Sequence, residues 1–164
     1  MYEHRFMRRA IDISALALET PGAEPFGAIV VRDGQIVGEG LNRSLLNHDP
    51  TSHGETEAIR DACRNLKTVD LRGCELYSSC EPCALCVAAM AIAGIARLHY
   101  AANREQSRNA MGKLPDTVRF PVDTVKMQSE CGKSISKRIM PSQQVLDNEA
   151  TIVIAAWAEK ARGI

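Results

Sequence analysis

Residues 74–102, CELYSSCEPCALCVAAMAIAGIARLHYAA, contain the pattern that most clearly indicates the fold class. Residues 74–79 and 96–102 are short runs rich in apolar residues, which is typical of strands. The apolar segment between them begins with Pro82, which favours a first helical turn, and stops at Gly94, which favours a helix end. Strand, helix and strand form a βαβ unit, so the two strands should be parallel.

The patterns on either side of this unit predict the remaining elements. Asp33-Gly34 separates two apolar runs, and this pair favours a hairpin turn because the turn needs positive φ at both positions. The elements expected before the unit are a helix over 5–19, strands over 26–31 and 35–41, and a helix from an N-cap at Thr51 or Ser52 to about Asn65. Those expected after it are a short helix over 104–112, a fifth strand over 122–127 and a helix over 148–163.

The composition is that of a globular domain. Of the 164 residues, 45% are apolar and 24% are charged, which fits one domain over 1–164. Twenty basic and 20 acidic residues give zero formal net charge, so the excess positive charge of a nucleic-acid binder is missing. The first apolar run is too short for a signal sequence or a membrane span. We therefore expect a small-molecule substrate, no membrane association and a cytoplasmic location.

Two of the six cysteines have the spacing of metal ligands. Cys83 and Cys86 lie three apart at the start of the predicted helix, so both sulfurs can reach one ion. His53 begins another predicted helix, and two helices on the same face of a sheet could bring their N-termini together. Zinc sites with three protein ligands keep a fourth position for water, whose pKa can fall to about 7.

Glu55 follows His53 by two residues, so the two side chains diverge by about 200° on an ideal helix. The carboxylate is then unable to chelate the same ion as the imidazole, but it can face the water. A carboxylate there can move a proton to a ring nitrogen and then to a leaving amine. These are the requirements of hydrolytic deamination of an amino-substituted aromatic ring.

HGE at 53–55 followed by PCALC at 82–86 resembles the H-x-E and P-C-x-x-C signature of zinc deaminases. On these motifs the chain is identified as a member of the cytidine deaminase superfamily. The stretches that most resemble bacterial guanine deaminases and related free-base deaminases are PFGAIVV (25–31), GEGLN (38–42), DPTSHGETEAI (49–59) and LYSSCEPCALC (76–86).

This resemblance implies a three-layer α/β/α fold with a five-stranded mixed sheet, order 2-1-3-4-5, between helices, and a homodimer. It implies one Zn²⁺ per chain and deamination of a free base, guanine first, giving xanthine and ammonia. The residues it implicates are the catalytic Glu55, the zinc ligands His53, Cys83 and Cys86, and the substrate-binding candidates Phe26, Ala28, Asn42, His53, Glu81 and Trp157. Segment 128–164 would be a C-terminal extension able to cover the active site, and Asp116, Asp123 or Glu149 would supply an acidic pocket residue.

Several alternatives stay open. The substrate could be cytosine, isocytosine, a triazine or a nucleoside, since Gly54 is also found in yeast-type cytosine deaminases. A tRNA adenosine deaminase would need phosphate-contacting cations, and 133–140 is the only basic cluster. A catalytically silent binding module would need the zinc ligands but not Glu55.

The metal site has two further interpretations. Cys80 as a fourth ligand would give a closed structural zinc site, but such a site would leave Glu55 without a role. A thioredoxin-like redox pair is the other, and it does not require a paired His53 and Glu55. We therefore expect Cys80 not to bind the metal.

Overall fold

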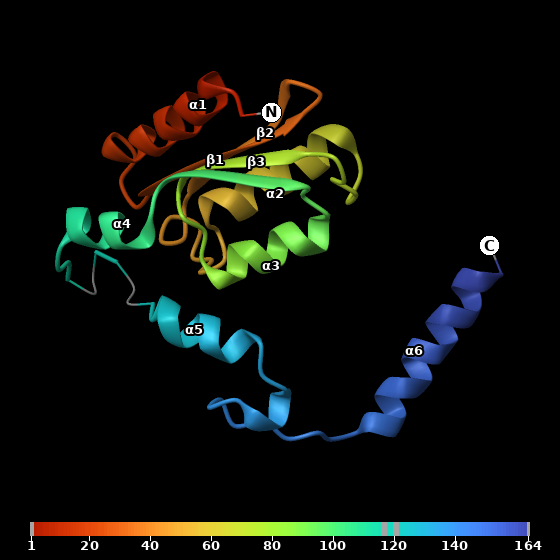
Figure 1. The fold of residues 1–164 in the computed structure, drawn as a ribbon. Helices are drawn as coiled ribbons and strands as arrows, with labels where there is room; N and C mark the ends of the chain where they lie inside the picture. The colour runs from red at the N-terminus through yellow and green to blue at the C-terminus, as the bar shows by residue number, and fades with distance from the viewer. Residues whose placement is uncertain (1, 116–117, 120–121, 164) are drawn as a thin grey trace. The chain divides into compact units, whose positions relative to one another are not determined.

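The computed structural model describes residues 2–115, 118–119 and 122–163 (Figure 1). The chain divides into two compact units, 1–128 and 129–164. The first unit holds the sheet and all three predicted metal ligands, so it is the unit that positions the site.

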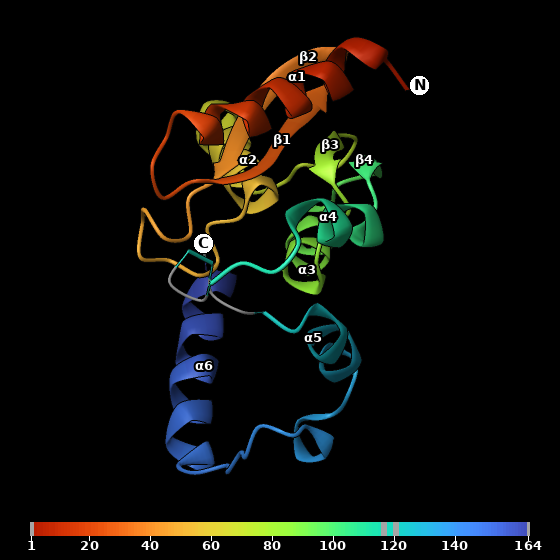
Figure 2. The ribbon, with the colours of Figure 1, turned by 90° about the vertical axis from the view of Figure 1, so that its left-hand side faces the viewer.

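The described part of the first unit contains a four-stranded mixed sheet in the order β2-β1-β3-β4. β1 pairs antiparallel with both β2 and β3, whereas β3 and β4 lie side by side and parallel (Figure 2). The parallel pair confirms the βαβ unit, and the hairpin turns at Asp33 and Gly34, both with positive φ. The strands are β1 (Glu24–Arg32), β2 (Gln35–Asn42), β3 (Glu75–Cys80) and β4 (Arg97–Ala102).

Helices cover both faces of this sheet, which confirms the three-layer fold (Figure 1). On one face α1 (His4–Ala15) buries Phe6, Ala10 and Ile13 against Ile29 and Tyr77. On the other, α2 (Gly54–Leu66) and α3 (Ala84–Ala93) form a second core with alternate strand residues such as Val30 and Leu76. A short 3₁₀ helix, η1 (Leu16–Leu18), extends α1.

The N-cap predicted for α2 was wrong. The N-cap is His53, and neither Thr51 nor Ser52 caps the helix. The hydroxyl of Ser52 is fully buried and donates to Glu57 Oε1 at 2.9 Å, while that of Thr51 donates to Asp49 Oδ1 at 2.6 Å. Both side chains are therefore engaged in ordering the loop that leads into His53.

The strand predicted over 122–127 was also wrong in its described residues. They begin α5 (Thr124–Cys131), where Asp123 Oδ1 accepts from the backbone N–H of Lys126 at 2.9 Å, a typical helix-start contact. The described sheet therefore ends at β4. Before α5, the predicted helix after β4 is present as α4 (Arg104–Met111), capped by Asn103.

The second unit holds a 3₁₀ helix, η2 (Ile135–Lys137), and α6 (Asp147–Arg162), which corresponds to the helix predicted over 148–163. Coverage of the active site by this segment stays a prediction. Within the described residues, no helix has both the length and the apolar character needed to cross a bilayer.

Glycines let α2 approach β2 closely enough to place its N-terminus beside the sheet. A Cβ at Gly40 would collide with the carbonyl oxygen of Gly54 and the amide nitrogen of Ala58. A Cβ at Gly38 would meet the backbone one turn further along α2 in the same way. Because the collisions are with backbone atoms, no side-chain rotation can relieve them.

We therefore expect Gly40→Ala to lower the free energy of unfolding by about 1–3 kcal/mol, the usual cost of overpacking. Urea denaturation followed by circular dichroism measures the change. Gly132→Ala is the matched control, since no atom lies within 4 Å of a Cβ added there. Equal urea midpoints for the two variants would contradict the close approach of α2 to β2.

Candidate active site

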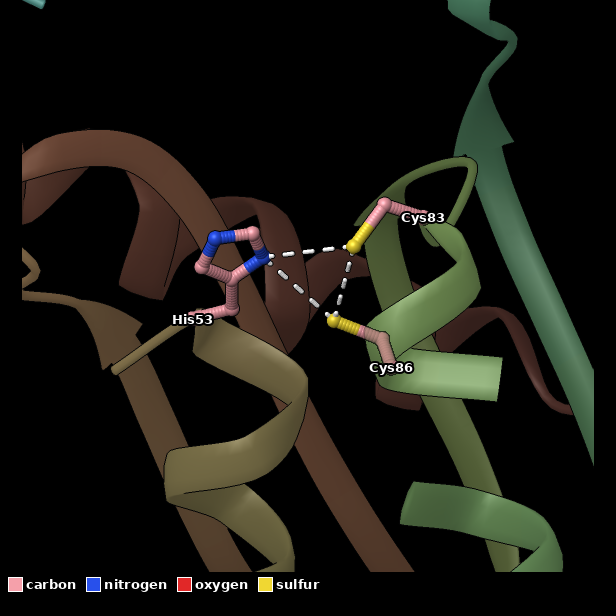
Figure 3. Close-up of side chains that lie close together, drawn as sticks. All are labelled: His53, Cys83 and Cys86. Atoms are coloured by element: carbon pink, nitrogen blue, oxygen red, sulfur yellow. Dashed lines mark hydrogen bonds between the residues drawn. The ribbon is translucent and has the colours of Figure 1, made fainter. Parts of the chain in front are cut away.

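The N-termini of α2 and α3 bring three metal-binding side chains together. His53 is the N-cap of α2, Cys83 is the N-cap of α3, and Cys86 lies in the first turn of α3. His53 Nδ1 lies 3.5 Å from the Sγ atom of each cysteine, and the two Sγ atoms are 3.6 Å apart (Figure 3). Within the described part of the chain, His53, Cys83 and Cys86 form the group whose ligand atoms lie close enough together, within 4.8 Å of one another, to hold one metal ion.

The donor set and its spacing suit a tetrahedral zinc ion. Zn–N bonds of about 2.0–2.1 Å and Zn–S bonds of about 2.3 Å imply N–S and S–S separations of about 3.6 and 3.8 Å. The observed separations of 3.5 and 3.6 Å are close to these values. One imidazole and two sulfurs leave one tetrahedral position for a further ligand.

Charge at the two sulfurs is unequal before a cation binds. Hydrogen bonding with Cys86, followed by that with His53, lowers the pKa of Cys83 to about 4. The same contact with Cys83, together with burial, raises the pKa of Cys86. Hydrogen bonding to Cys83 raises the pKa of His53. The pair thus holds one thiolate that can recruit a cation, and metal binding requires release of the second thiol proton.

Glu55 lies in the first turn of α2 and is only 6% exposed. Its Oε1 accepts from the Ser78 hydroxyl at 3.2 Å, and its Oε2 lies 3.3 Å from Cys86 Sγ. Burial is the main cause that raises the pKa of this carboxyl group. Glu55 lines the same pocket as His53 and Cys83, so a carboxyl group with an elevated pKa lies beside the metal-binding group.

A pocket of about 480 Å³ opens in front of this group. Of the residues predicted to bind substrate, Phe26, Asn42, His53 and Glu81 line it, as does Asp123. The volume is enough for a nucleobase and exceeds what one base needs.

The other predicted pocket residues lie elsewhere or outside the described chain. Ala28 is fully buried in the core under α2 and does not line the pocket. Trp157, 70% exposed, and Glu149 both lie on α6 of the second unit, so their roles stay predictions. Asp116 lies outside the described residues.

Cys80 lines the pocket but does not belong to the metal-binding group. It is the last residue of β3, before the chain turns into α3, whereas Cys83 and Cys86 belong to the helix start. Burial raises the pKa of its thiol, which disfavours the thiolate that zinc binds. The arrangement supports an open three-ligand site.

Two ion pairs in the pocket wall were missed by sequence reasoning. Arg119 Nε contacts Glu24 Oε2 at 2.9 Å, and the guanidinium lies 5.3 Å from the centre of the Phe26 ring. Arg104 contacts Glu81 at 3.2 Å. Glu24 and Arg119 are 95 positions apart, so no local pattern could have paired them.

Comparison with protein families gives a match over residues 1–102 to the cytidine and deoxycytidylate deaminase zinc-binding region. This range contains all three candidate ligands and Glu55.

Individual relatives extend the similarity along nearly the whole chain. Guanine deaminase of Bacillus subtilis is 33% identical over 96% of this chain and 94% of its own. A solved structure of guanine deaminase from that organism has a TM-score of 0.81, covering 97% and 95% of the two chains. A tRNA-specific adenosine deaminase of Buchnera aphidicola is 31% identical over 97% and 90%. A further protein, whose crystal structure was solved in complex with 2,6-diaminopurine, is 28% identical in sequence. Its TM-score is 0.60, and the match covers 66% of this chain and 60% of that one.

We expect Cys86→Ser to abolish tight zinc binding because it removes one of three protein ligands. Cys80→Ser is the matched control and should retain zinc, since Cys80 stands outside the metal-binding group. Elemental analysis after dialysis against a weak chelator measures the zinc per chain. Loss of zinc from Cys80→Ser, or its full retention in Cys86→Ser, would show that the ligand set is different.

Proposed function

The chain belongs to the cytidine and deoxycytidylate deaminase family, and we propose that it hydrolyses the amino group of free guanine, giving xanthine and ammonia. The observation that carries this proposal is the position of Glu55, buried on the wall of the pocket that also contains His53 and Cys83. A purely structural zinc site would have no use for a buried carboxyl group beside it.

The proposed resident cofactor is one zinc ion per chain, held by His53, Cys83 and Cys86. Zinc in such a site supplies Lewis-acid chemistry that makes water nucleophilic near neutral pH. Glu55 would accept a proton from the attacking water and deliver it to the adjacent ring nitrogen. It would then carry the second proton of that water, from the new hydroxyl group on the carbon, to the departing amino group. The water oxygen forms the new C–O bond, the C–N bond breaks, and ammonia leaves.

Phe26 and Asn42 are proposed to bind the base. Phe26 presents an apolar ring to the pocket, and the Arg119 guanidinium lies 5.3 Å from the centre of that ring. Asn42 is 3% exposed and presents an amide that can hydrogen-bond a ring edge. Together they would orient the amine-bearing carbon toward the metal-binding group.

We propose guanine over the other candidate bases because the chain is similar over nearly its full length to Bacillus guanine deaminase, in sequence and in structure. A homodimer is proposed because α3 is apolar overall yet leaves Val87 and Ile92 exposed. A cytoplasmic location is proposed because the ligand thiols must stay reduced.

A tRNA adenosine deaminase is the second candidate, supported by the similarity to the Buchnera relative. The balanced charge of the chain speaks against it, since tRNA binding depends on excess positive charge. Tight, salt-sensitive tRNA binding with release of ammonia from the bound tRNA would reverse this ranking.

The purified protein should release ammonia from guanine, and chelation of zinc should stop the reaction. A panel of guanine, cytosine, isocytosine, adenine and their nucleosides, with and without chelator, separates the candidates. Absence of ammonia from every compound would favour a silent binding module.

Glu55→Gln should keep its zinc and fold but lose on the order of 10²–10⁴-fold in kcat, because the amide is unable to shuttle protons. Glu39→Gln is the matched control, since Glu39 pairs with Arg9 and does not line the active-site pocket. Turnover of Glu55→Gln equal to that of the control would rule out the proton-transfer role.

A further inference from the structure

Two polar residues lie opposite each other at the start of β1 and the end of β2, beside the candidate active site. Glu24 and Asn42 are cross-strand partners, and both line the pocket with His53. The side chains of directly opposed residues in an antiparallel pair are within reach of the same small ligand. Glu24 was not among the predicted site residues, and it has no role in the proposed deamination steps.

Asn42 is oriented so that it offers a donor. Its Oδ1 accepts from the backbone N–H of Ser44 at 3.0 Å and from the Ser44 hydroxyl at 2.9 Å. A backbone N–H can only donate, so the oxygen of the amide must face Ser44 and the NH₂ group must face away from it. Among the described residues, no acceptor engages this NH₂ group.

Glu24 offers an acceptor. Its Oε2 accepts from Arg119 Nε at 2.9 Å, while Oε1 makes no hydrogen bond with the described residues. Every fully buried side-chain nitrogen or oxygen in the described part of the chain has a partner. Oε1 of Glu24 and Nδ2 of Asn42 are therefore accessible atoms, and the pocket is the accessible space that both residues share.

We propose that Glu24 is a specificity-determining residue which, paired with Asn42, recognises the C6=O and N1–H edge of a 6-oxopurine. Nδ2 of Asn42 donates to the carbonyl oxygen, and Oε1 of Glu24 accepts from the neighbouring N–H. This inference rests on the proposed function and narrows its substrate to bases that carry an acceptor next to a donor.

Glu24 and Asn42 would disfavour a purine in which the hydrogen-bond donor and acceptor at this edge are exchanged. A 6-amino purine presents an NH₂ donor and an unprotonated N1 acceptor at these positions. The Asn42 NH₂ group would then face a donor, and the Glu24 carboxylate, which has no proton to donate, would face an acceptor. Leaving buried polar groups without partners is the strongest way for a site to exclude an analogue.

Guanine and 2,6-diaminopurine test the proposal because they carry the same reacting amino group at C2 and differ at the edge. In the wild-type protein, kcat/KM for guanine should exceed that for 2,6-diaminopurine by about 100-fold or more. Glu24→Gln should lower kcat/KM for guanine by about 10- to 100-fold, the usual effect of losing a charge-assisted hydrogen bond. It should leave 2,6-diaminopurine unchanged or improved, because Gln can donate to N1.

Glu39→Gln is again the matched control, since it disrupts an Arg–Glu pair outside this pocket and should leave the ratio of the two substrates unchanged. Zinc content and melting temperature check that Glu24→Gln is folded. An equal loss for both substrates would assign Glu24 a structural role through Arg119 and overturn the proposal. Wild-type turnover of both bases at equal kcat/KM would overturn it without any variant.

The two proposals fail in different ways. If the wild-type protein deaminates neither base, the proposed guanine deaminase function falls, and the inference about Glu24 falls with it. If the wild-type protein deaminates guanine but Glu24→Gln keeps the guanine preference, only the inference about Glu24 is wrong.

Discussion

The arrangement of the site depends on one constraint: the N-termini of α2 and α3 must meet on the same face of the sheet. Gly38 and Gly40 let α2 lie directly on β2, and the βαβ connection places α3 on that face as well. His53 and Cys83 are the N-caps of these two helices, so their side chains converge. The positive ends of both helix dipoles point to the same spot, which favours thiolates and a carboxylate there.

This convergence also explains why the site contains two kinds of acidic group. Cys83 is held as a thiolate by its neighbours, whereas burial raises the pKa of the Glu55 carboxyl group. The first property suits metal binding, and the second suits proton transfer. The Ser78 hydroxyl on β3 donates a hydrogen bond to the Glu55 carboxyl group, so the sheet contributes to the site as well as the helices.

The sequence predicted the parts of the fold that depend on local pattern. Pro82 and Gly94 bracketed α3 to within two residues, Asp33-Gly34 placed the hairpin, and the spacing of the H-x-E and C-x-x-C motifs singled out the three residues that converge. The predictions from sequence failed where a side chain has a hydrogen-bond partner that the local sequence pattern does not reveal. Asp123 starts a helix in place of a strand, and Glu24 meets Arg119 from 95 positions away.

The proposed chemistry requires an open zinc site with three protein ligands. X-ray absorption at the zinc edge of the purified protein tests it most directly. Zinc held by His53, Cys83 and Cys86 should show two sulfur neighbours at about 2.3 Å and two nitrogen or oxygen neighbours at about 2.0–2.1 Å, one from His53 and one from solvent. Three sulfur neighbours would show instead that Cys80 closes the site as a fourth protein ligand.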